Sequence, residues 1–448
     1  MNTPICDFIK KYSESESIRL HMPGHKGTTL TGPEALDITE ISGADSLYEA
    51  SGIIRESEQN ASLLFGCDTY YSTEGSSQCI KAMLYLMHIY AKTNHKNPLI
   101  LAGRNAHRAF ISGLALTDMQ VEWIYPEEGD NYLRCNISPK RLESILKDMT
   151  DLPVAVYLTS PDYLGNICDV TGLAQVCHKY GVLLLVDNAH GAYLRFEEES
   201  GHPTDLGADM CCDSAHKTLP VLTGGAYLHI SHNLSTKLGS YVRGALSLFG
   251  STSPSYLILS SLDAANKYLS ERYRDALKLT SSQIRKVKDS LLSHGYTLCG
   301  EESLKITLQT KDYGYTGLDF AEILAKNNII CEFADPDFVV LMMTPMTSEA
   351  ELLALEQVLL SIPSLPAIIS APPLPDIPER VTTVREAIFS QSESIPVSEA
   401  LGRILADTCI GCPPAVPVLV SGERITPAAI RCFEYYSIET CRVVKDET

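Results

Sequence analysis

The stretch Val182-Leu-Leu-Leu-Val-Asp187 decides the fold, and Asn188-Ala-His190 follows it directly. Consecutive apolar residues without polar alternation are typical of a strand that is buried on both faces of a parallel sheet. In open sheets of this kind, ligands bind beyond the carboxyl ends of the strands. The run therefore predicts a buried parallel strand that delivers Asp187 to a ligand-binding edge, where function explains a carboxylate better than packing does.

The same pattern continues on both sides of this strand. Apolar strand-like runs at residues 98–102 and 153–158 alternate with helical stretches at residues 78–92 and 172–180. Such alternation is typical of an α/β protein in which helices cover both faces of a mostly parallel sheet. We therefore expect an α/β fold.

A long helical pattern and a proline-rich stretch divide the chain into four expected parts. Apolar residues at helical spacing indicate a long helix over residues 263–290 that leaves the first large domain. Residues 363–378 hold six prolines, which is typical of a linker or an extended surface strap. The expected parts are an N-terminal segment (1–36), a large domain (37–265), a smaller α/β domain (266–365), and a proline-rich linker with a C-terminal domain (366–448).

Composition excludes several classes of partner. The chain has 448 residues and a formal net charge of −19, so nucleic acids and anionic membranes would repel its surface. It has neither an N-terminal secretory signal nor an apolar run long enough to span a bilayer, which predicts a cytoplasmic protein with reduced thiols. Its 14 cysteines lack the doubled spacing of zinc sites, and we expect the isolated pair Cys409-Ile-Gly-Cys412 to pack. No metal is predicted.

A lysine completes a chemical pair with Asp187. Lys217 stands in Asp213-Ser-Ala-His-Lys-Thr218, thirty residues after Asp187. A pyridoxal 5'-phosphate enzyme requires an amine that forms a Schiff base and a carboxylate that keeps the pyridine nitrogen protonated. Lys217 and Asp187 meet this requirement, although an exposed loop lysine is the competing interpretation of the Lys217 run taken alone.

A phosphate cradle is predicted at Thr73-Glu-Gly-Ser-Ser-Gln78, where a helix begins. The backbone N–H groups of Gly75, Ser76 and Ser77 and the two serine hydroxyls would meet an anion at the helix N-terminus. A serine N-cap without a ligand is the competing interpretation. His107 follows the strand at residues 98–102, where an imidazole could stack on a flat cofactor or serve only as a loop residue.

The segment around Lys217 would anchor the cofactor at both ends. We expect residues 214–218 to be extended, so that alternate side chains point to opposite sides. Ser214 and His216 would then donate to a phosphate while Lys217 reaches the aldehyde carbon. The following Thr223-Gly-Gly-Ala226 gives the backbone room for a close approach.

Several motifs occur in an order that resembles a known family. They are Leu20-His-Met-Pro-Gly-His-Lys-Gly27, Ser214-Ala-His-Lys-Thr-Leu-Pro220, Thr252-Ser-Pro-Ser-Tyr256 with Ser260-Ser-Leu-Asp263, and Pro413-Pro-Ala-Val-Pro-Val-Leu-Val-Ser-Gly-Glu423. Together they resemble the ornithine/lysine/arginine decarboxylases, in the short form of Gram-positive-type bacteria that lacks a receiver-like domain. The resemblance implies an aspartate-aminotransferase-like large domain of fold type I.

The resemblance also implies roles for individual residues. Lys217 would carry the internal aldimine of pyridoxal 5'-phosphate, Asp187 would pair with the pyridine nitrogen, and His190 would lie near the phenolic oxygen. His107 would stack over the ring. The phosphate would be held by Gly75, Ser76, Ser77, Ser214 and His216, with Ser253 arriving from a neighbouring subunit. A homodimer or a higher even-numbered homo-oligomer is therefore implied.

The expected reaction is decarboxylation of a basic amino acid to the corresponding amine, a polyamine precursor. Arginine or lysine is favoured over ornithine. Lys217 and His216 both qualify as the group that returns a proton to Cα, and the sequence leaves this choice open. Asp45, Asp162 and Glu423 are candidates for binding the cationic head group, and each has a structural role as its competing interpretation.

Three positions depart from the family pattern. Glu74 stands before the Gly-Ser pair, Asn188 replaces the glutamate of the usual Asp-Glu-Ala-His-Gly motif, and Ala415 replaces a glycine. None of them removes a reacting group.

Two further hypotheses stay open. An aminotransferase or other lyase on the same fold would need an arginine, such as Arg243 or Arg403, for the α-carboxylate. The third hypothesis is a catalytically silent cofactor-binding regulatory protein.

Overall fold

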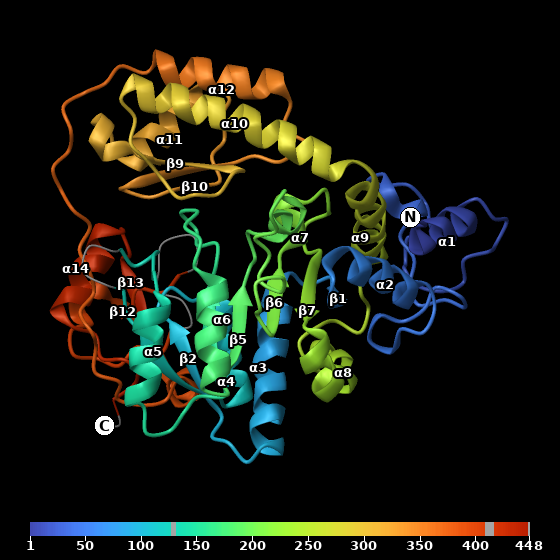
Figure 1. The fold of residues 1–448 in the computed structure, drawn as a ribbon, viewed down its shortest axis with the longest axis horizontal. Coiled ribbons are helices and arrows are strands. Elements are labelled where there is room, and N and C mark those ends of the chain that lie inside the picture. The colour runs from blue at the N-terminus through green and yellow to red at the C-terminus, as the bar shows by residue number, and fades with distance from the viewer. Residues whose placement is uncertain (127–130, 408–415, 447–448) are drawn as a thin grey trace. The chain divides into compact units, whose positions relative to one another are not determined.

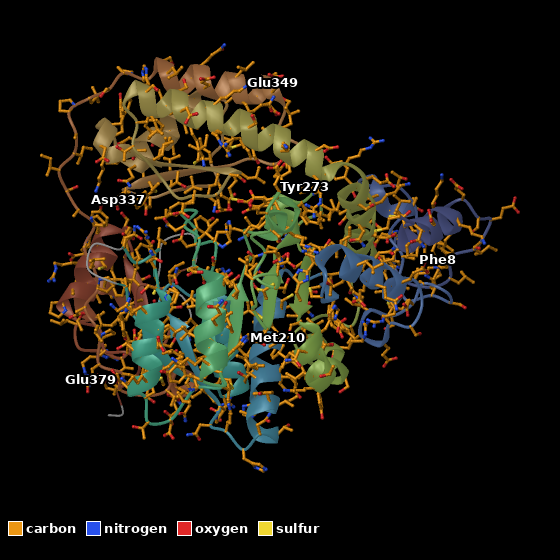
Figure 2. The ribbon with its side chains drawn as sticks, in the orientation of Figure 1. Phe8, Met210, Tyr273, Asp337, Glu349 and Glu379 are labelled. Carbon is orange, nitrogen blue, oxygen red and sulfur yellow. The ribbon has the colours of Figure 1, made fainter. Side chains whose placement is uncertain are left out.

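The structure is a computed structural model that describes residues 1–126, 131–407 and 416–446. The chain forms two compact units, each made from two segments. Unit 1 contains Met1–Asn97 and Val170–Ala276, and unit 2 contains Pro98–Asp169 and Leu277–Thr448. Figure 1 shows the elements as a ribbon, and Figure 2 adds their side chains. The four-part division expected from the sequence stays a prediction.

The strands of unit 1 lie in the order β1-β7-β6-β5. Their bounds are Asp68–Ser72 for β1, Leu183–Asp187 for β5, Met210–Asp213 for β6 and Ala226–Ile230 for β7. β5 and β6 are parallel, while β7 is antiparallel to both β6 and β1. Strands β1, β5 and β6 therefore run in one direction, and the residues that follow them meet at one edge of the sheet.

The strand predicted at residues 182–187 is confirmed as β5. All of its residues except the first are buried, as the unbroken apolar run requires. Every residue of β6 and β7 is buried as well. These two strands nevertheless contain Asp213 and His229, polar residues that must find hydrogen-bond partners inside the protein.

Helix α3, Ser76–Thr93, contains the helix expected over residues 78–92 and begins at Ser76, so the predicted cradle forms its first turn. The expected helix at residues 172–180 corresponds to α6, Val170–Lys179. Before residue 256, unit 1 also contains α1 (Pro4–Ser13), η1 (Pro33–Ala35), η2 (Leu47–Glu49), α2 (Ile53–Phe65), η3 (Ala192–Phe196), α7 (Ala215–Thr218) and α8 (His232–Ser247).

The long helix expected over residues 263–290 is longer and less regular than predicted. It consists of α9 (Tyr256–Tyr268), a π-helical turn η4 (Leu269–Tyr273) and α10 (Arg274–His294). The Ser255 hydroxyl caps its first turn by accepting from the N–H of Ile258 at 3.4 Å. Asp263 lies inside α9, where its buried carboxylate accepts from the N–H groups of Ile5 and Cys6 at 3.0 Å each and so caps α1.

The parallel strands of unit 2 lie in the order β4-β2-β3. They are β2 (Leu99–Gly103), β3 (Gln120–Ile124) and β4 (Ala155–Thr159), and they confirm the runs expected at residues 98–102 and 153–158. Helices α4 (Arg108–Thr117) and α5 (Pro139–Asp148) follow β2 and β3 along the chain. Parallel pairing therefore joins β2 to both β3 and β4, and it also joins β5 to β6 within unit 1.

A second, antiparallel sheet of unit 2 has the order β10-β11-β9-β8. Its strands are β8 (Leu298–Cys299), β9 (Lys305–Gln309), β10 (Phe333–Ala334) and β11 (Phe338–Met342), and η5 (Thr310–Tyr313) follows β9. Figure 1 shows α10 on the same side of this sheet as α11 (Gly317–Lys326) and α12 (Glu349–Ser361). This part of unit 2 therefore combines helices with an antiparallel sheet.

The C-terminal part of unit 2 packs in a hydrophobic cluster that it shares with other segments of this unit. Its elements are α13 (Val384–Phe389), β12 (Ser392–Pro396), η6 (Val397–Glu399), α14 (Pro427–Tyr435) and β13 (Thr440–Val444), with β12 and β13 antiparallel. Leu405, Leu419 and Phe433 pack in this cluster. The proline-rich residues 363–378 form neither helix nor strand, and the N–H of Leu365 donates to the Tyr313 carbonyl at 3.1 Å.

Among the described residues, no helix combines the length and the hydropathy needed to cross a membrane. The cysteines in the described part of the chain are free thiols. Cys409 and Cys412 lie outside the described residues, as does Ala415. The expectations for these three positions therefore stay predictions.

Candidate active site

The turn that carries Lys217 differs from the expectation. Residues 215–218 form the short helix α7, so the prediction of an extended run was wrong. The N–H of Lys217 donates to the Ser214 carbonyl at 3.0 Å, and the N–H of Leu219 donates to the Ala215 carbonyl at 2.8 Å. These local bonds satisfy backbone groups as the chain leaves β6. Ser214 and Lys217, three positions apart, therefore share one side of the turn.

Lys217 meets a histidine from the neighbouring strand end. Its Nζ lies 2.9 Å from Nε2 of His190, a residue of the loop after β5 that is only 4% exposed. Lys217 itself is half-buried. The structure thus brings together two of the predicted site residues, which lie 27 positions apart in the sequence.

Asp187 ends β5 and is 2% exposed. Its Oδ1 accepts from the N–H of Ala189 at 3.1 Å and from the thiol of Cys212 at 3.6 Å. Burial, reinforced by the charge of Asp187, raises the pKa of Cys212 well above its ordinary value, so the thiol keeps its hydrogen and donates it. Cys212 was not among the predicted site residues, and its only signal was its place one residue before Asp213 at the end of an apolar run.

Two serine hydroxyls meet at the N-terminus of α3. Oγ of Ser214 donates to Oγ of Ser76 at 2.8 Å. Gly75 is the N-cap of the helix, has a φ of +71° and provides no side-chain cap. A Cβ on Gly75 would project into the open space 4.0 Å from the amide nitrogen of Ser77. The arrangement leaves room for an anion at the helix N-terminus.

The amide of Gly75 does not belong to this donor set. Its N–H donates to the carbonyl of Gly224 at 2.8 Å, which corrects the expectation that it would face a phosphate. Gly224 has a φ of +98°, and a Cβ there would lie 2.9 Å from the Thr73 carbonyl oxygen. Only glycine permits this approach of the two loops.

His216 is fixed by the same loop. Its Nδ1 lies 3.0 Å from the carbonyl oxygen of Gly225, which also accepts from the backbone N–H of His216 at 3.2 Å. Because a carbonyl only accepts, Nδ1 carries the hydrogen of a neutral ring. Any contact of His216 with a ligand therefore uses Nε2, which donates only when the ring is protonated.

Glu74 presents no electrostatic obstacle to this site. Its side chain is exposed to solvent, while its backbone N–H donates to the Ser72 hydroxyl at 3.1 Å. The departure from the family pattern at this position therefore places the carboxylate in water, where its charge is screened.

Two further predicted residues have local backbone partners. His107 belongs to unit 2, where it is the N-cap of α4 and its Nδ1 accepts from the N–H of Ala109 at 3.1 Å. A neutral ring in this state carries its hydrogen on Nε2. Ser253 lies exposed between α8 and α9, and its N–H donates to the Ser251 hydroxyl at 3.1 Å. Their roles toward a cofactor stay predictions.

The three acids proposed for a cationic head group all have partners inside the chain. Asp45 accepts from the N–H groups of Ser51 and Gly52 at 3.0 and 2.8 Å. Burial opposes the ionisation of Asp45, but these and other backbone donors outweigh it and hold the pKa below its ordinary value. The acid is thereby tied to the start of α2 and has a structural role.

Asp162 and Glu423 are also engaged. Burial raises the pKa of Asp162 to about 6, and its carboxylate accepts from the backbone and side-chain amides of Asn166 at 2.9 and 2.8 Å. Glu423 accepts from Nη2 of Arg104 at 3.0 Å and from the N–H of Val420 at 2.7 Å. Both acids stabilise local structure in unit 2.

The arginines considered for an aminotransferase are likewise bound. Arg243 pairs with Glu58, and its Nη1 donates to the Leu47 carbonyl at 2.7 Å. Arg403 pairs with Glu393 at 2.9 Å and donates to the Val444 carbonyl at 2.8 Å. Each guanidinium therefore holds its own segment of the fold.

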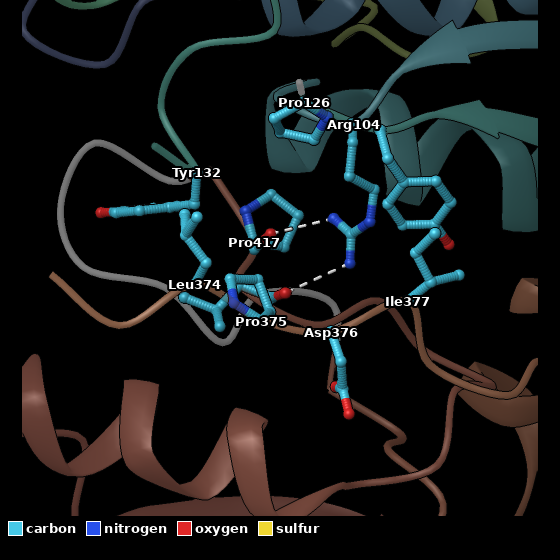
Figure 3. Close-up of a pocket in the computed structure, with 10 residues that line it drawn as sticks. Arg104, Pro126, Tyr132, Leu374, Pro375, Asp376, Ile377 and Pro417 are labelled. Carbon is cyan, nitrogen blue, oxygen red and sulfur yellow. Dashed lines mark hydrogen bonds between the residues drawn. The ribbon is translucent and has the colours of Figure 1, made fainter. Parts of the chain in front are cut away.

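A cavity of about 190 Å³ lies elsewhere, in unit 2 (Figure 3). In it, Arg104 donates to the carbonyls of Pro417 and Val418 at 3.0 and 3.3 Å. None of the residues predicted to bind a cofactor lines this cavity. Its lining is Arg104, Tyr125, Pro126, Tyr132, Leu374, Pro375, Asp376, Ile377, Pro417 and Val418.

The residues gathered in unit 1 fit pyridoxal 5'-phosphate. Ser76 and Ser214 offer hydroxyls at a helix N-terminus, which suits a phosphate group. Lys217 offers an amine and Asp187 a buried carboxylate, the two groups that the aldehyde and the pyridine nitrogen require. The chemistry of this donor set therefore matches both ends of the cofactor.

Solved structures define the class of the fold. The lysine decarboxylase of Francisella novicida superposes with a TM-score of 0.79 at 16% identity, covering 99% of this chain and 81% of that one. Lysine decarboxylase A of Pseudomonas aeruginosa gives a TM-score of 0.78 at 16% identity, covering 99% and 80%. These proteins are fold type I enzymes, so the expected α/β fold with a mostly parallel sheet is confirmed.

Sequence comparison then gives the family. The family model for the Orn/Lys/Arg decarboxylase major domain matches residues 3–299, and the model for the C-terminal domain matches residues 375–441. The arginine decarboxylase of Bacillus subtilis is 29% identical over 457 residues, covering 95% of this chain and 91% of that protein. The chain belongs to the Orn/Lys/Arg decarboxylase family and is a decarboxylase of a basic amino acid.

Proposed function

We propose that the protein is a pyridoxal 5'-phosphate-dependent arginine decarboxylase. The observation that carries this proposal is the contact of 2.9 Å between Nζ of Lys217 and Nε2 of His190, at the sheet edge where Asp187 is buried. Membership of a decarboxylase family supports the reaction. The paired hydroxyls of Ser76 and Ser214 support a phosphate-bearing cofactor.

Each side chain of this site has a proposed task. Pyridoxal 5'-phosphate, when bound, would supply an electron-withdrawing ring that accepts the electron pair released at Cα. Lys217 would hold the cofactor covalently through Nζ, and Asp187 would keep a proton on the pyridine nitrogen. Ser76 and Ser214 would donate to the phosphate. His190 would orient Nζ of Lys217 through its Nε2.

The net reaction breaks one bond and adds one proton. The bond between Cα and the carboxylate breaks, carbon dioxide leaves, and a proton binds to Cα to give the amine. Lys217 Nζ and His216 Nε2 are the two groups proposed to return this proton. If His216 acts, it must do so through Nε2, because its Nδ1 hydrogen is directed to the carbonyl of Gly225.

Arginine is proposed as the substrate because relatives of nearly the same length carry that name. The arginine decarboxylases of Bacillus subtilis and Bacillus anthracis are 29% and 28% identical and are matched over 91% of their lengths. The solved lysine decarboxylases are 16% identical and support the fold alone. Lysine is the second candidate. A guanidinium and an ammonium need different partners, since the first is planar and bidentate.

The decarboxylase proposal is supported against the two alternatives. An aminotransferase would bind the α-carboxylate through an arginine, but Arg243 and Arg403 are engaged by Glu58 and Glu393. A silent regulatory protein has no chemical need for Lys217, Asp187 and His190 at one sheet edge. A homodimer or a higher even-numbered homo-oligomer, with Ser253 reaching a neighbouring phosphate, stays part of the proposal.

The proposal is tested with purified protein loaded with pyridoxal 5'-phosphate and given arginine, lysine or ornithine separately. We expect carbon dioxide and agmatine from arginine. Cadaverine from lysine alone would retain the reaction and change the substrate. With a 2-oxo acid added as the amino-group acceptor, a keto acid formed from the substrate without carbon dioxide would replace the decarboxylase by an aminotransferase. A bound cofactor without any turnover under the same conditions would favour the silent protein.

A further inference from the structure

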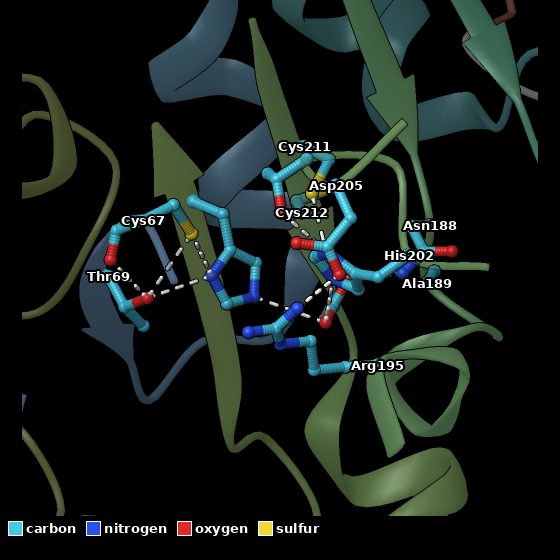
Figure 4. Close-up of polar contacts among 12 residues, drawn as sticks. Cys67, Thr69, Asn188, Ala189, Arg195, His202, Asp205, Cys211 and Cys212 are labelled. Carbon is cyan, nitrogen blue, oxygen red and sulfur yellow. Dashed lines mark hydrogen bonds and ion pairs between the residues drawn. The ribbon is translucent and has the colours of Figure 1, made fainter. Parts of the chain in front are cut away.

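Asp213, the last residue of β6, has a carboxylate with 0% exposure. Its Oδ2 accepts from Nε2 of His202 and from Nε2 of His229 at 3.1 Å each, and its Oδ1 accepts from the side-chain amide of Asn188 at 2.7 Å. Figure 4 shows this cluster of polar contacts. A carboxylate ionised in the protein interior is tolerated only when donors surround it, as these three do.

The hydrogens of the cluster can be assigned from the central carboxylate, which only accepts and so requires a hydrogen on each Nε2. Nδ1 of His202 contacts the Thr204 hydroxyl at 2.8 Å, and Nδ1 of His229 contacts the Thr69 hydroxyl at 2.9 Å. With each hydroxyl donating to Nδ1, each neutral ring carries its hydrogen on Nε2 and donates it to Asp213. Burial opposes the ionisation of Asp213, but the two imidazoles outweigh it and hold its pKa below the ordinary value. The cluster then carries a single negative charge, on Asp213, and this carboxylate accepts hydrogen bonds from all three neighbouring side chains.

The cluster lies between the two segments of the proposed active site. Asn188 follows Asp187 directly, and Asp213 stands four positions before Lys217. The backbone N–H of Asn188 also donates to the carbonyl of Cys212 at 3.0 Å. The side chain and the backbone of Asn188 therefore both hold the end of β5 against the end of β6.

We propose that Asn188 and Asp213 are a matched positioning pair, whose amide-to-carboxylate bond sets the spacing between Asp187 and Lys217. This inference rests on the functions proposed for Asp187 and Lys217. It also accounts for the departure at Asn188, because the glutamate usual in the family motif would bring a second carboxylate against Asp213. The amide in this chain suits its buried acidic partner.

A metal site made from the same atoms is the competing assignment. Ligand atoms of His202, Cys211 and Asp213 lie within 4.8 Å of one another. However, Nε2 of His202 carries a hydrogen directed at Asp213, and burial raises the pKa of the Cys211 thiol well above its ordinary value. A metal ion would have to displace both hydrogens to bind here, so the hydrogen-bonded cluster is the assignment tested below.

Three variants separate the possibilities. Asn188→Asp places two carboxylates in contact, and Asp213→Asn places two amides in contact. The double variant N188D/D213N exchanges the two groups. The amide nitrogen introduced at position 213 would donate to the carboxylate introduced at position 188, while the amide oxygen at position 213 accepts from both imidazoles. The exchange thus keeps every hydrogen bond and the single negative charge of the cluster.

We expect Asn188→Asp to lower the Tm of the cofactor-free protein by about 5 °C or more, because it buries a second carboxylate against Asp213. Asp213→Asn should lower the Tm less, because the Asn188 amide can turn its oxygen toward the introduced amide nitrogen. In the loaded Asn188→Asp enzyme we expect kcat to fall by about 100-fold with KM within about threefold, since misplacement affects the reacting groups more than binding. The exchange variant should recover most of both quantities.

Asp209→Asn is the matched control. Asp209 precedes β6 at the opposite end and accepts from Nε2 of His178 at 2.9 Å and from the N–H of Leu184 at 2.8 Å. Its loss should lower the Tm with kcat nearly unchanged. Recovery of both Tm and kcat in the exchange variant supports the pair.

Several results would overturn the inference. They are an Asn188→Asp variant that behaves like wild type, an exchange variant no better than Asn188→Asp, and a Tm that changes without any change in kcat. Equimolar zinc retained by the wild-type protein and lost in His202→Asn, measured by elemental analysis, would also overturn the hydrogen-bond assignment. If the wild-type protein decarboxylates no basic amino acid, the proposed function fails by itself. The recovery of Tm in the exchange variant then decides the pair.

Discussion

Asp187→Asn is the substitution that isolates the charge of Asp187 from its shape. Asparagine keeps the volume of the side chain, and its oxygen can still accept from the N–H of Ala189, now at 3.1 Å from Oδ1. Only the negative charge is lost. Because Asp187 is 2% exposed, solvent provides little screening of that charge.

The magnitude follows from the burial of the site. Removing one partner of a buried charged pair costs about 3 to 5 kcal/mol, and each 1.36 kcal/mol lowers a rate tenfold. With the proposed protonated pyridine nitrogen as the other partner, we expect Asp187→Asn to lower kcat by roughly 150- to 5000-fold. The lower value applies where the asparagine amide partly replaces the interaction. The Tm of the cofactor-free protein should change by less than about 2 °C, because the backbone bond is retained.

The assay measures carbon dioxide released from arginine by the loaded enzyme over a range of substrate concentrations, with the Tm of the cofactor-free protein measured in parallel. Asp209→Asn, a buried aspartate at the opposite end of β6, is the control and should retain kcat. A kcat within about threefold of wild type in Asp187→Asn, from protein that binds the cofactor fully, would refute the role assigned to this carboxylate.

Three further predictions concern other parts of the chain. Lys217→Ala should abolish decarboxylation and the absorbance of a lysine-bound cofactor, and persistence of that absorbance would place the attachment elsewhere. Gly224→Ala should weaken cofactor binding and lower the free energy of unfolding by about 1 to 3 kcal/mol, because the φ of Gly224 is +98° and the new Cβ would lie 2.9 Å from the Thr73 carbonyl oxygen. Cofactor titration and denaturant unfolding measure these two effects. Unchanged values of both would show that the two loops can move apart to accept the methyl group. Burial raises the pKa of Asp335 to about 7, above about 3.9 in the unfolded chain. Its contribution to stability is therefore full below pH about 4 and lost as the pH rises to about 7, so Asp335→Asn should raise the free energy of unfolding at pH 8 by up to about 4 kcal/mol and change it little at pH 4. Exposed Asp312→Asn should show no such difference, and an equal effect of Asp335→Asn at both pH values would contradict the assignment.

The sequence predicts strands and helices best where a single spacing of apolar residues dominates a segment. The apolar run at residues 182–187 became β5, and the helix predicted over residues 78–92 lies inside α3. The turn at α7 could not be predicted from the pattern, because four residues are too few to show a helical period. The π-helical turn Leu269–Tyr273 gives no signal in apolar spacing, since one extra residue shifts the helix without interrupting its hydrophobic face.

The sequence indicated the reactive residues of the candidate site more readily than the residues that hold them in position. Both Lys217 and His190 were predicted as site residues, and they meet because both follow parallel strands that end at one edge. Asp213 was missed, although it stands next to Ser214. Its partners His202 and His229 are 11 and 16 positions away, and only the folded chain brings them to one carboxylate. A charged residue ending the buried run Met210–Asp213 was the available signal.

The most direct test of the central claim is carbon dioxide release from arginine by the loaded wild-type enzyme, compared side by side with Lys217→Ala and with lysine and ornithine as substrates. We expect stoichiometric carbon dioxide and agmatine from arginine with wild-type protein, and neither product with Lys217→Ala. Wild-type protein that binds pyridoxal 5'-phosphate but releases no carbon dioxide from any of the three amino acids would contradict the central claim.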